Sequence, residues 1–183
     1  MDWYSTVKFL HVTAAIIWLG GGFMMIVLST RTERSGDSQA MLMNLGNMAA
    51  LGNLLFMPAS IATLASGLVM AGLWTGFSDL WIIVGLAGAA STFVTGALFL
   101  KPAGDRIAAM AARDGATAAV LAEGGKILRI GKFDYTVMLV VIADMVMKPT
   151  WGDHAILGAM GAVISLGALL FLAPRRVSGE ASA

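Results

Sequence analysis

Long apolar segments dominate the chain and alternate with shorter polar ones. Apolar runs of about 18 or more residues recur, and a helix of that length crosses the hydrocarbon core of a bilayer, which is about 30 Å thick. The pattern predicts five membrane-spanning helices, over about residues 4–28, 51–74, 80–100, 133–147 and 155–172. We therefore expect an all-α fold, a polytopic transmembrane helix bundle, in which residues 1–173 form one domain and residues 174–183 form a polar cytoplasmic tail.

Prolines interrupt or follow three of these predicted helices. Pro58 lies inside the second and predicts a kink there, because a proline removes a backbone hydrogen bond and clashes with the preceding turn. Lys101 and Pro102 are predicted to end the third helix, and Lys148 and Pro149 are predicted to end the fourth.

The two longer polar connections are expected to be helical in part. From Asp37 onward a helix is predicted that runs into the second span. The Ala-rich stretch after the third span predicts an amphipathic helix, interrupted near Gly115 and ended by Gly124 and Gly125, since glycine favours helix ends.

The composition supports a membrane protein and excludes several kinds of functional site. Hydrophobic residues make up 58% of the chain and charged residues 13%, with a mean hydropathy of +0.81, whereas a soluble domain carries about 25% charged residues. The chain has no cysteine, which excludes disulfides, thiolate metal sites and cysteine nucleophiles. No phosphate-binding glycine loop or nucleophile–base motif occurs, and nucleic-acid binding has no support.

Basic residues predict the orientation of the bundle. Ten fall in the connection after the first span, in the connection after the third span and in the tail, and only Lys8 and Lys148 fall on the other side. With five spans, the N-terminus is expected outside and the C-terminus in the cytoplasm. The lipid bilayer is thus the first partner of the chain, and a bacterial-type inner (cytoplasmic) membrane is the expected location of this multi-pass protein.

Small and hydroxyl residues recur at helical spacing within the spans. Ser60, Thr63, Gly67 and Met70 share one face of the second span. Gly88, Ser91, Thr92 and Thr95 share a face of the third. Such faces are typical of helix–helix contacts in membranes, because small residues let backbones approach closely, and they also suit the lining of a cofactor site or a pathway.

His11 is the first candidate for chemistry, since it lies within the first apolar segment. An ionisable residue inside a membrane is a functional candidate by default. His11, Ala15, Trp18, Gly22 and Met25 form one helical stripe, with small residues that leave room for a flat ligand or for a neighbouring helix. The imidazole is expected either to make a hydrogen bond to another helix or to ligate haem or a metal.

Asp144 is the second intramembrane candidate. Lys148 follows it by one helical turn and is nearer the outer surface, so an ion pair within the helix is one expectation. A proton relay, or an acceptor for the second ring nitrogen of His11, is the other. Asp144 and His11 are both predicted to lie toward the outer leaflet.

A second axial ligand for a haem bound by His11 would be His154, Met25 or none. His154 starts the fifth span and is otherwise an interfacial side chain. The thirteen methionines suggest copper as an alternative, since thioethers suit Cu(I), although methionine is also a flexible packing residue.

The stretch "KFLHVTAAIIWLGGGF" resembles the opening of the CopD-like superfamily of small helical membrane proteins. This superfamily includes copper-resistance CopD domains, HemJ-type protoporphyrinogen oxidases and uncharacterised predicted membrane proteins. "LLFMPASIATLASGLVMA" and "LVVIADMVMKP" are similar to two further HemJ-type helices, so the resemblance covers residues 4 to about 150. The uncharacterised branch fits best.

The resemblance implies that His11 is a haem ligand. It also raises protoporphyrinogen oxidase activity as a possibility, but Gly85 stands where that family has a lysine, which counts against this enzyme activity. The leading hypothesis is a membrane protein that binds haem b through His11 and has a redox or electron-transfer role. A copper-handling transporter of CopD type and a cofactor-free accessory subunit are the alternatives, and a homo-oligomer or a redox partner is expected beside the lipid.

Overall fold

The computed structural model describes residues 2–173, and every regular element within that range is a helix. The helices are α1 (Trp3–Ser35), α2 (Ser38–Leu51), α3 (Met57–Met70), α4 (Leu80–Val94), α5 (Lys101–Asp114), α6 (Ala118–Met147) and α7 (His154–Phe171). Three π-helical turns, Gly52–Phe56, Ala71–Thr75 and Thr95–Leu100, continue these helices without a break. The predicted all-α bundle is confirmed, and the predicted tail lies outside the described residues.

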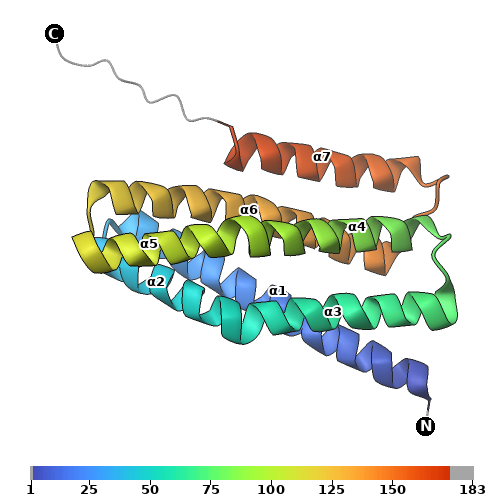
Figure 1. Ribbon diagram of the computed structural model, residues 1–183. Helices are drawn as coiled ribbons and strands as arrows, with labels where there is room; N and C mark the ends of the chain where they lie inside the picture. Colours follow the sequence, from blue (N-terminus) through green and yellow to red (C-terminus); the bar gives the residue numbers. More distant parts are fainter. Residues whose placement is uncertain (1, 174–183) are drawn as a thin grey trace.

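Figure 1 shows five long rods that run alternately in opposite directions: α1, α2 with α3, α4 with α5, α6, and α7. α1 packs mainly on α3, and α6 packs on α4, α7 and α1. Two ends of the bundle follow from this arrangement. We call the end where α1 finishes and α6 begins the charged end, and the end that holds Asp2 and the α6–α7 connection the N-terminal end.

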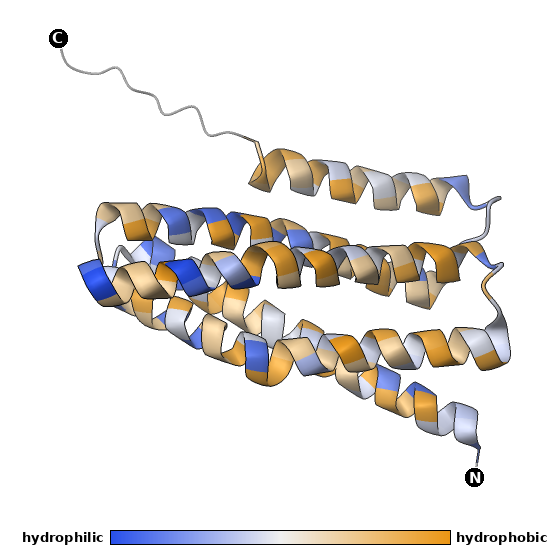
Figure 2. Ribbon diagram, in the orientation of Figure 1, coloured by the Kyte–Doolittle hydropathy of each residue, from blue (hydrophilic) through white to orange (hydrophobic). Residues whose placement is uncertain are grey.

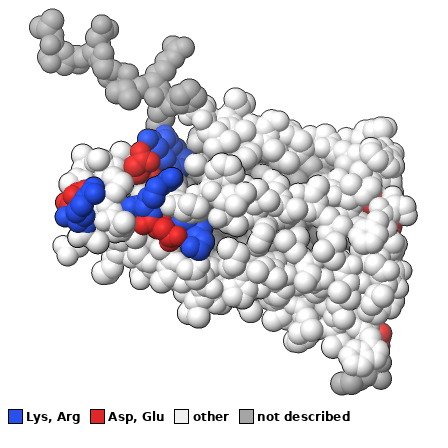
Figure 3. Space-filling view, viewed as in Figure 1, with Lys and Arg blue, Asp and Glu red and all other residues white. Residues whose placement is uncertain are grey.

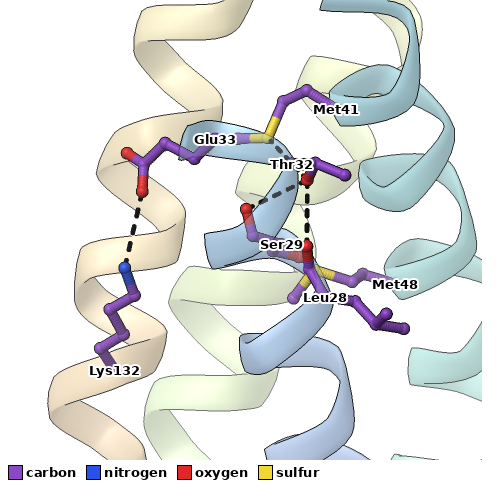
Figure 4. A network of polar contacts seen from close by, with 7 residues as sticks. All are labelled: Leu28, Ser29, Thr32, Glu33, Met41, Met48 and Lys132. Atoms are coloured by element: carbon purple, nitrogen blue, oxygen red, sulfur yellow. Dashed lines mark hydrogen bonds and ion pairs between the residues drawn. The ribbon is translucent and has the colours of Figure 1, made fainter. Parts of the chain in front are cut away.

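The charged end carries most of the ionised side chains on the visible face (Figure 3), and the ribbon is bluest there (Figure 2). Figure 4 shows how the end of α1 is held in this region. Glu33 faces Lys132 of α6, with 3.5 Å between Oε2 and Nζ. The Ser29 hydroxyl donates to the sulfur of Met48 at 3.3 Å, and the Asn44 amide donates to the Thr32 hydroxyl at 3.0 Å.

One of the three proline predictions is wrong, since the helix does not end at Lys101 and Pro102. The rod around Pro58 is continuous as well, and a π-helical turn ends two residues before each of these two prolines. At those turns the backbone N–H bonds five residues back, from Met57 to the Gly52 carbonyl and from Lys101 to the Gly96 carbonyl. The wider turn accommodates the proline within a continuous helix. Pro149 does follow the end of α6, where Lys148 adopts a left-handed backbone with φ +48°.

Of the predictions made for glycines, one is confirmed and one is wrong. Gly115 interrupts the helix with φ +70°, as expected. Gly124 and Gly125 do not end a helix, because α6 runs through both of them. The first of these glycines instead allows α2 to approach: a Cβ at Gly124 would lie 2.8 Å from Cδ1 of Leu45. The close packing of α2 on α6 thus explains why a glycine suits this position, and the sequence alone does not reveal that contact.

Among residues 2–173, four helical rods are long and apolar enough to cross a membrane, namely α1, Ser38–Thr75, Leu80–Asp114 and α7. α6 has the length but carries Lys132, Asp134 and Asp144 in its apolar half. It nevertheless lies among α1, α4 and α7, so its polar groups face protein on several sides. The fourth predicted span, which lies in α6, is therefore more polar than the other four.

α7 is attached to the rest of the bundle along α6 (Figure 1). Gly167 forms part of this contact, since a Cβ there would lie 2.9 Å from Cγ2 of Thr136. We expect Gly167→Leu to weaken the attachment of α7 by about 1–3 kcal/mol through overpacking. Limited proteolysis of the α6–α7 connection should become faster in this variant. Gly161→Leu is the matched control, because nothing lies within 4 Å of a Cβ at that position; equal cleavage of both variants would contradict the assigned contact.

The arrangement also makes the orientation testable. Arg34 and Gly115 lie at the charged end, and Phe77 and Gly152 lie in the connections at the N-terminal end. Reporter fusions after Arg34, after Gly115 and at the C-terminus are expected to report cytoplasm, and fusions at Phe77 and Gly152 the opposite side, because basic residues stay inside. A C-terminal fusion reported outside would contradict the predicted orientation.

Candidate functional site

Helices of the described bundle line two cavities that contain the residues of interest. The larger, of about 690 Å³, is toward the N-terminal end between α1, α3, α4 and α6, and we call it the N-terminal cavity. The smaller, of about 200 Å³, lies toward the charged end and includes Lys101, Asp105 and Asp134 in its lining. Trp18 and Thr92 line both cavities, together with Met138. These three side chains therefore belong to the wall between the two spaces.

His11 lines the N-terminal cavity, and α3 fixes the orientation of its ring. The Nδ1–H group donates to the Thr63 carbonyl, with 2.9 Å between nitrogen and oxygen. The Ser66 hydroxyl lies 3.2 Å from the same nitrogen and donates its own hydrogen to the Ala62 carbonyl at 2.6 Å. Both oxygens near Nδ1 thus act as acceptors, which assigns the proton to Nδ1.

This tautomer leaves Nε2 of a neutral His11 with a free lone pair. A hydrogen bond from one ring nitrogen to a backbone carbonyl is the usual way in which proteins orient a metal-binding histidine. The ring also lies directly on α3 at Gly67, where a Cβ would be 3.3 Å from its Cε1 atom. The glycine therefore gives the imidazole the room that this orientation needs.

The N-terminal cavity is lined mainly by apolar and aromatic side chains, with a few cations near its end. Trp18 and Trp81 belong to the lining, as do Lys8 and Lys148. Nζ of Lys148 lies 4.7 Å from the centre of the Trp81 ring, and Nζ of Lys8 lies 5.9 Å from that of Tyr4. Each ammonium group therefore lies within cation–π distance of an aromatic ring.

Asp144 is completely buried, and neither of its carboxylate oxygens has a hydrogen-bond partner among residues 2–173. Within that range no ion pair joins it to Lys148, whose ammonium lies over Trp81 instead. The expected pair is therefore wrong, because the left-handed backbone of Lys148 takes its side chain out of the helical register. The expected acceptor for His11 is also different, since Thr63 has that role.

Other residues of the predicted site lie apart from His11. Met25 is buried and His154 is exposed at the start of α7, and neither is among the residues that line the two cavities. Met70 does line the N-terminal cavity, as Met138 does. The geometry thus brings His11 and Trp18 together and leaves Met25 and His154 outside.

Sequence reasoning missed the role of Thr63 and Ser66 as partners of His11. A signal was present, because Thr63, Gly67 and Met70 form one polar or small face of the second span. All three line the N-terminal cavity. The face therefore both contacts a neighbouring helix and lines the N-terminal cavity.

The part of the chain that the structure describes contains no cluster of three or more His, Asp or Glu side chains that could hold a metal ion. The family described as "Predicted integral membrane protein (DUF2269)" matches residues 5–149. Comparison with curated proteins and comparison with solved structures each find no match. The matched range contains α2 to α6, all of α1 except its first two residues and every residue that lines the two cavities except Tyr4, and it excludes α7.

Proposed function

We propose, for a chain that belongs to the DUF2269 family of predicted integral membrane proteins, that it binds haem b in the N-terminal cavity through Nε2 of His11. The observation that carries the proposal is the hydrogen bond from Nδ1 of His11 to the Thr63 carbonyl. It fixes a tautomer whose other nitrogen is an available ligand. The resemblance to HemJ-type proteins independently supports His11 as the ligand.

The cavity suits a porphyrin in size and character. Its volume of about 690 Å³ lies within the range of about 300–1,000 Å³ that is usual for ligand and cofactor sites. Trp18, Trp81 and the surrounding aliphatic side chains supply the apolar surface that a haem pocket requires. Gly67, which also lines the cavity, lets the imidazole lie directly against α3.

The two lysines of the cavity suit the propionate groups of haem. Lys8 and Lys148 are the cations in its lining, and a carboxylate paired with an ammonium makes a charge-assisted hydrogen bond. Both lie toward the N-terminal end, close to the ends of their helices, where water can reach the propionates. Lys8 and Lys148 would then hold the propionates, and the apolar lining would surround the rest of the group.

When bound, haem b supplies one-electron redox chemistry, and its potential depends on axial ligation and on the polarity of the pocket. The residues of this chain would hold it, orient the imidazole and exclude water. We propose on this basis a redox or electron-transfer role in a bacterial-type cytoplasmic membrane, with a redox partner that supplies or accepts the electron. A homo-oligomer is compatible with the same site.

The test is an absorption spectrum of the full chain, purified after expression with added haem precursor. We expect a Soret band, a reduced-minus-oxidised difference spectrum of a b-type haem and iron in a near-stoichiometric amount. A colourless protein that also fails to take up hemin during reconstitution would overturn the proposal. If it is free of metal as well, the cofactor-free accessory role is favoured.

Copper handling is the second candidate, and one observation favours it. The thioethers of Met70 and Met138 line the same cavity as the free nitrogen of His11, and sulfur and imidazole ligands suit Cu(I). Metal analysis of the same preparation separates the two candidates. Copper without a Soret band would favour this second candidate, whereas iron with a Soret band would favour haem.

A further inference from the structure

Asp144 is a buried ionisable residue that the proposed haem site does not use. It lies on α6 one turn before the helix ends, with an exposed fraction of 0%. Both carboxylate oxygens are without a hydrogen-bond partner among the described residues. An ionised carboxylate in such surroundings would have no compensation for its lost hydration. The neutral acid is the form that this environment accepts.

Only a thin layer of atoms separates the Asp144 carboxyl from the N-terminal cavity. Gly85 of α4 lines that cavity, and a Cβ at this glycine would lie 3.2 Å from Oδ2 of Asp144. The space that such a Cβ would occupy is taken by the Met145 methyl group, which lies 1.8 Å from its position. Gly85 therefore leaves a notch in the wall, and the end of a methionine side chain fills it.

Methionine is well suited to a movable cover. Its side chain is unbranched and has three rotatable bonds, so it changes rotamer more easily than a branched residue does. Met145 also lines the N-terminal cavity itself. Rotation of this side chain into the cavity would uncover the Asp144 carboxyl through the notch at Gly85.

The other ionisable groups near this end are few. α4 has none between Leu80 and Val94, and α7 contributes only His154 at its exposed start. From α1, Lys8 and His11 line the cavity beyond the notch, with Tyr4 beside them. On α6 itself, Lys148 is turned to Trp81. The cations nearest to a deprotonated Asp144 are thus reached through the cavity.

We propose that Asp144 is an intramembrane proton-binding site, which exchanges its proton with water at the Lys8 and Lys148 end of the N-terminal cavity when Met145 moves away from Gly85. In this exchange the carboxyl O–H bond breaks, its electron pair stays on the oxygen and the proton forms a new bond to a cavity water. The reverse step restores the neutral acid. The site is separate from His11 and does not depend on the proposed haem.

An apolar carbodiimide tests this proposal, because it reacts with neutral carboxylic acids in apolar surroundings. The full chain in nanodiscs is treated with dicyclohexylcarbodiimide, and adducts are located by mass spectrometry of peptides. We expect slow labelling of Asp144 in the wild-type protein and labelling faster by several-fold in Met145→Ala, which removes the cover. Met145→Leu, which keeps the bulk, is the matched control and should react about as slowly as the wild type.

Asp144→Asn should lose this adduct, while helix content and elution volume show that each variant is folded. Labelling should also decrease as the pH rises, because the deprotonated form does not react. An Asp144 that stays unlabelled in both the wild type and Met145→Ala would overturn the proposal, and so would equal rates in these two proteins. The same labelling is expected in His11→Ala, so a failure of the haem proposal would leave this result unchanged.

Discussion

His11→Ala is expected to purify without haem and without a Soret band, while the protein still inserts and folds. The substitution removes the nitrogen that we assign as the iron ligand, and the aromatic and apolar walls of the cavity alone give haem no axial bond. Its structural cost is small, since the main loss is one hydrogen bond to the Thr63 carbonyl, which contributes about 0.5–1.5 kcal/mol. The measurement is haem per protein by pyridine haemochrome analysis, together with circular dichroism and elution volume.

His154→Ala is the matched control, because this second histidine is exposed and outside the lining of either cavity. Its spectrum should equal that of the wild type. Added imidazole should restore part of the haem to His11→Ala by replacing the missing ring. An unchanged Soret band in His11→Ala would show that His11 is only a hydrogen-bond donor between α1 and α3.

The orientation of the His11 ring can be tested separately through Gly67. A Cβ atom at position 67 would lie 3.3 Å from Cε1 of His11. The two methyl groups of Gly67→Val would therefore reach the space that the ring now occupies. The imidazole must then rotate or leave Thr63, so we expect weaker haem binding and a shifted spectrum rather than a complete loss. Gly72→Val on the same rod has nothing within 4 Å of its Cβ, and it should behave as the wild type does.

The sequence predicted the helical class, the membrane location and the face of the second span that contains Thr63 and Gly67. These features depend on local pattern, because apolar length and residue spacing are set within each segment. The partner of His11 could not be predicted in the same way. It depends on the axial register of α1 against α3, and a shift of one turn would bring a different carbonyl to Nδ1.

The errors around Pro102 and Gly124 have a related physical cause. Proline and glycine are poor helix residues in isolation, but a helix in a bundle is also stabilised by its neighbours. A π-helical turn accommodates Pro102, and the contact with Leu45 makes a small residue favourable at Gly124. Likewise, the four-residue spacing of Asp144 and Lys148 predicted an ion pair. The left-handed backbone of Lys148 separates the two side chains instead.

The bundle is much longer than the hydrocarbon core of a bilayer is thick. Part of it is therefore expected to be surrounded by lipid, and part by water. The rod Leu80–Asp114 has 35 residues, and at 1.5 Å per residue it spans about 50 Å, whereas the hydrocarbon core is about 30 Å thick. At the charged end, Ile107, Val120 and Ile127 form a buried cluster between α5 and α6. If this end projects into water, as its charges indicate, the hydrophobic effect stabilises the cluster there.

Ile107→Ala is therefore expected to destabilise the protein by about 2–5 kcal/mol, the usual range for removing a large buried aliphatic side chain. Ile107 is only 3% exposed, and the helices around it leave a cavity after the truncation. Leu98→Ala on the same rod is the matched control, since Leu98 is 65% exposed and faces lipid, which is as apolar as the side chain itself. Two measurements test this prediction: thermal unfolding in detergent micelles, monitored by circular dichroism, and the rate of proteolysis within α5 and α6. We expect a clearly lower Tm and faster cleavage for Ile107→Ala and little change for Leu98→Ala. Equal effects of the two substitutions would show that the charged end is not stabilised by a water-excluding core, and that the whole rod is packed as a membrane helix is.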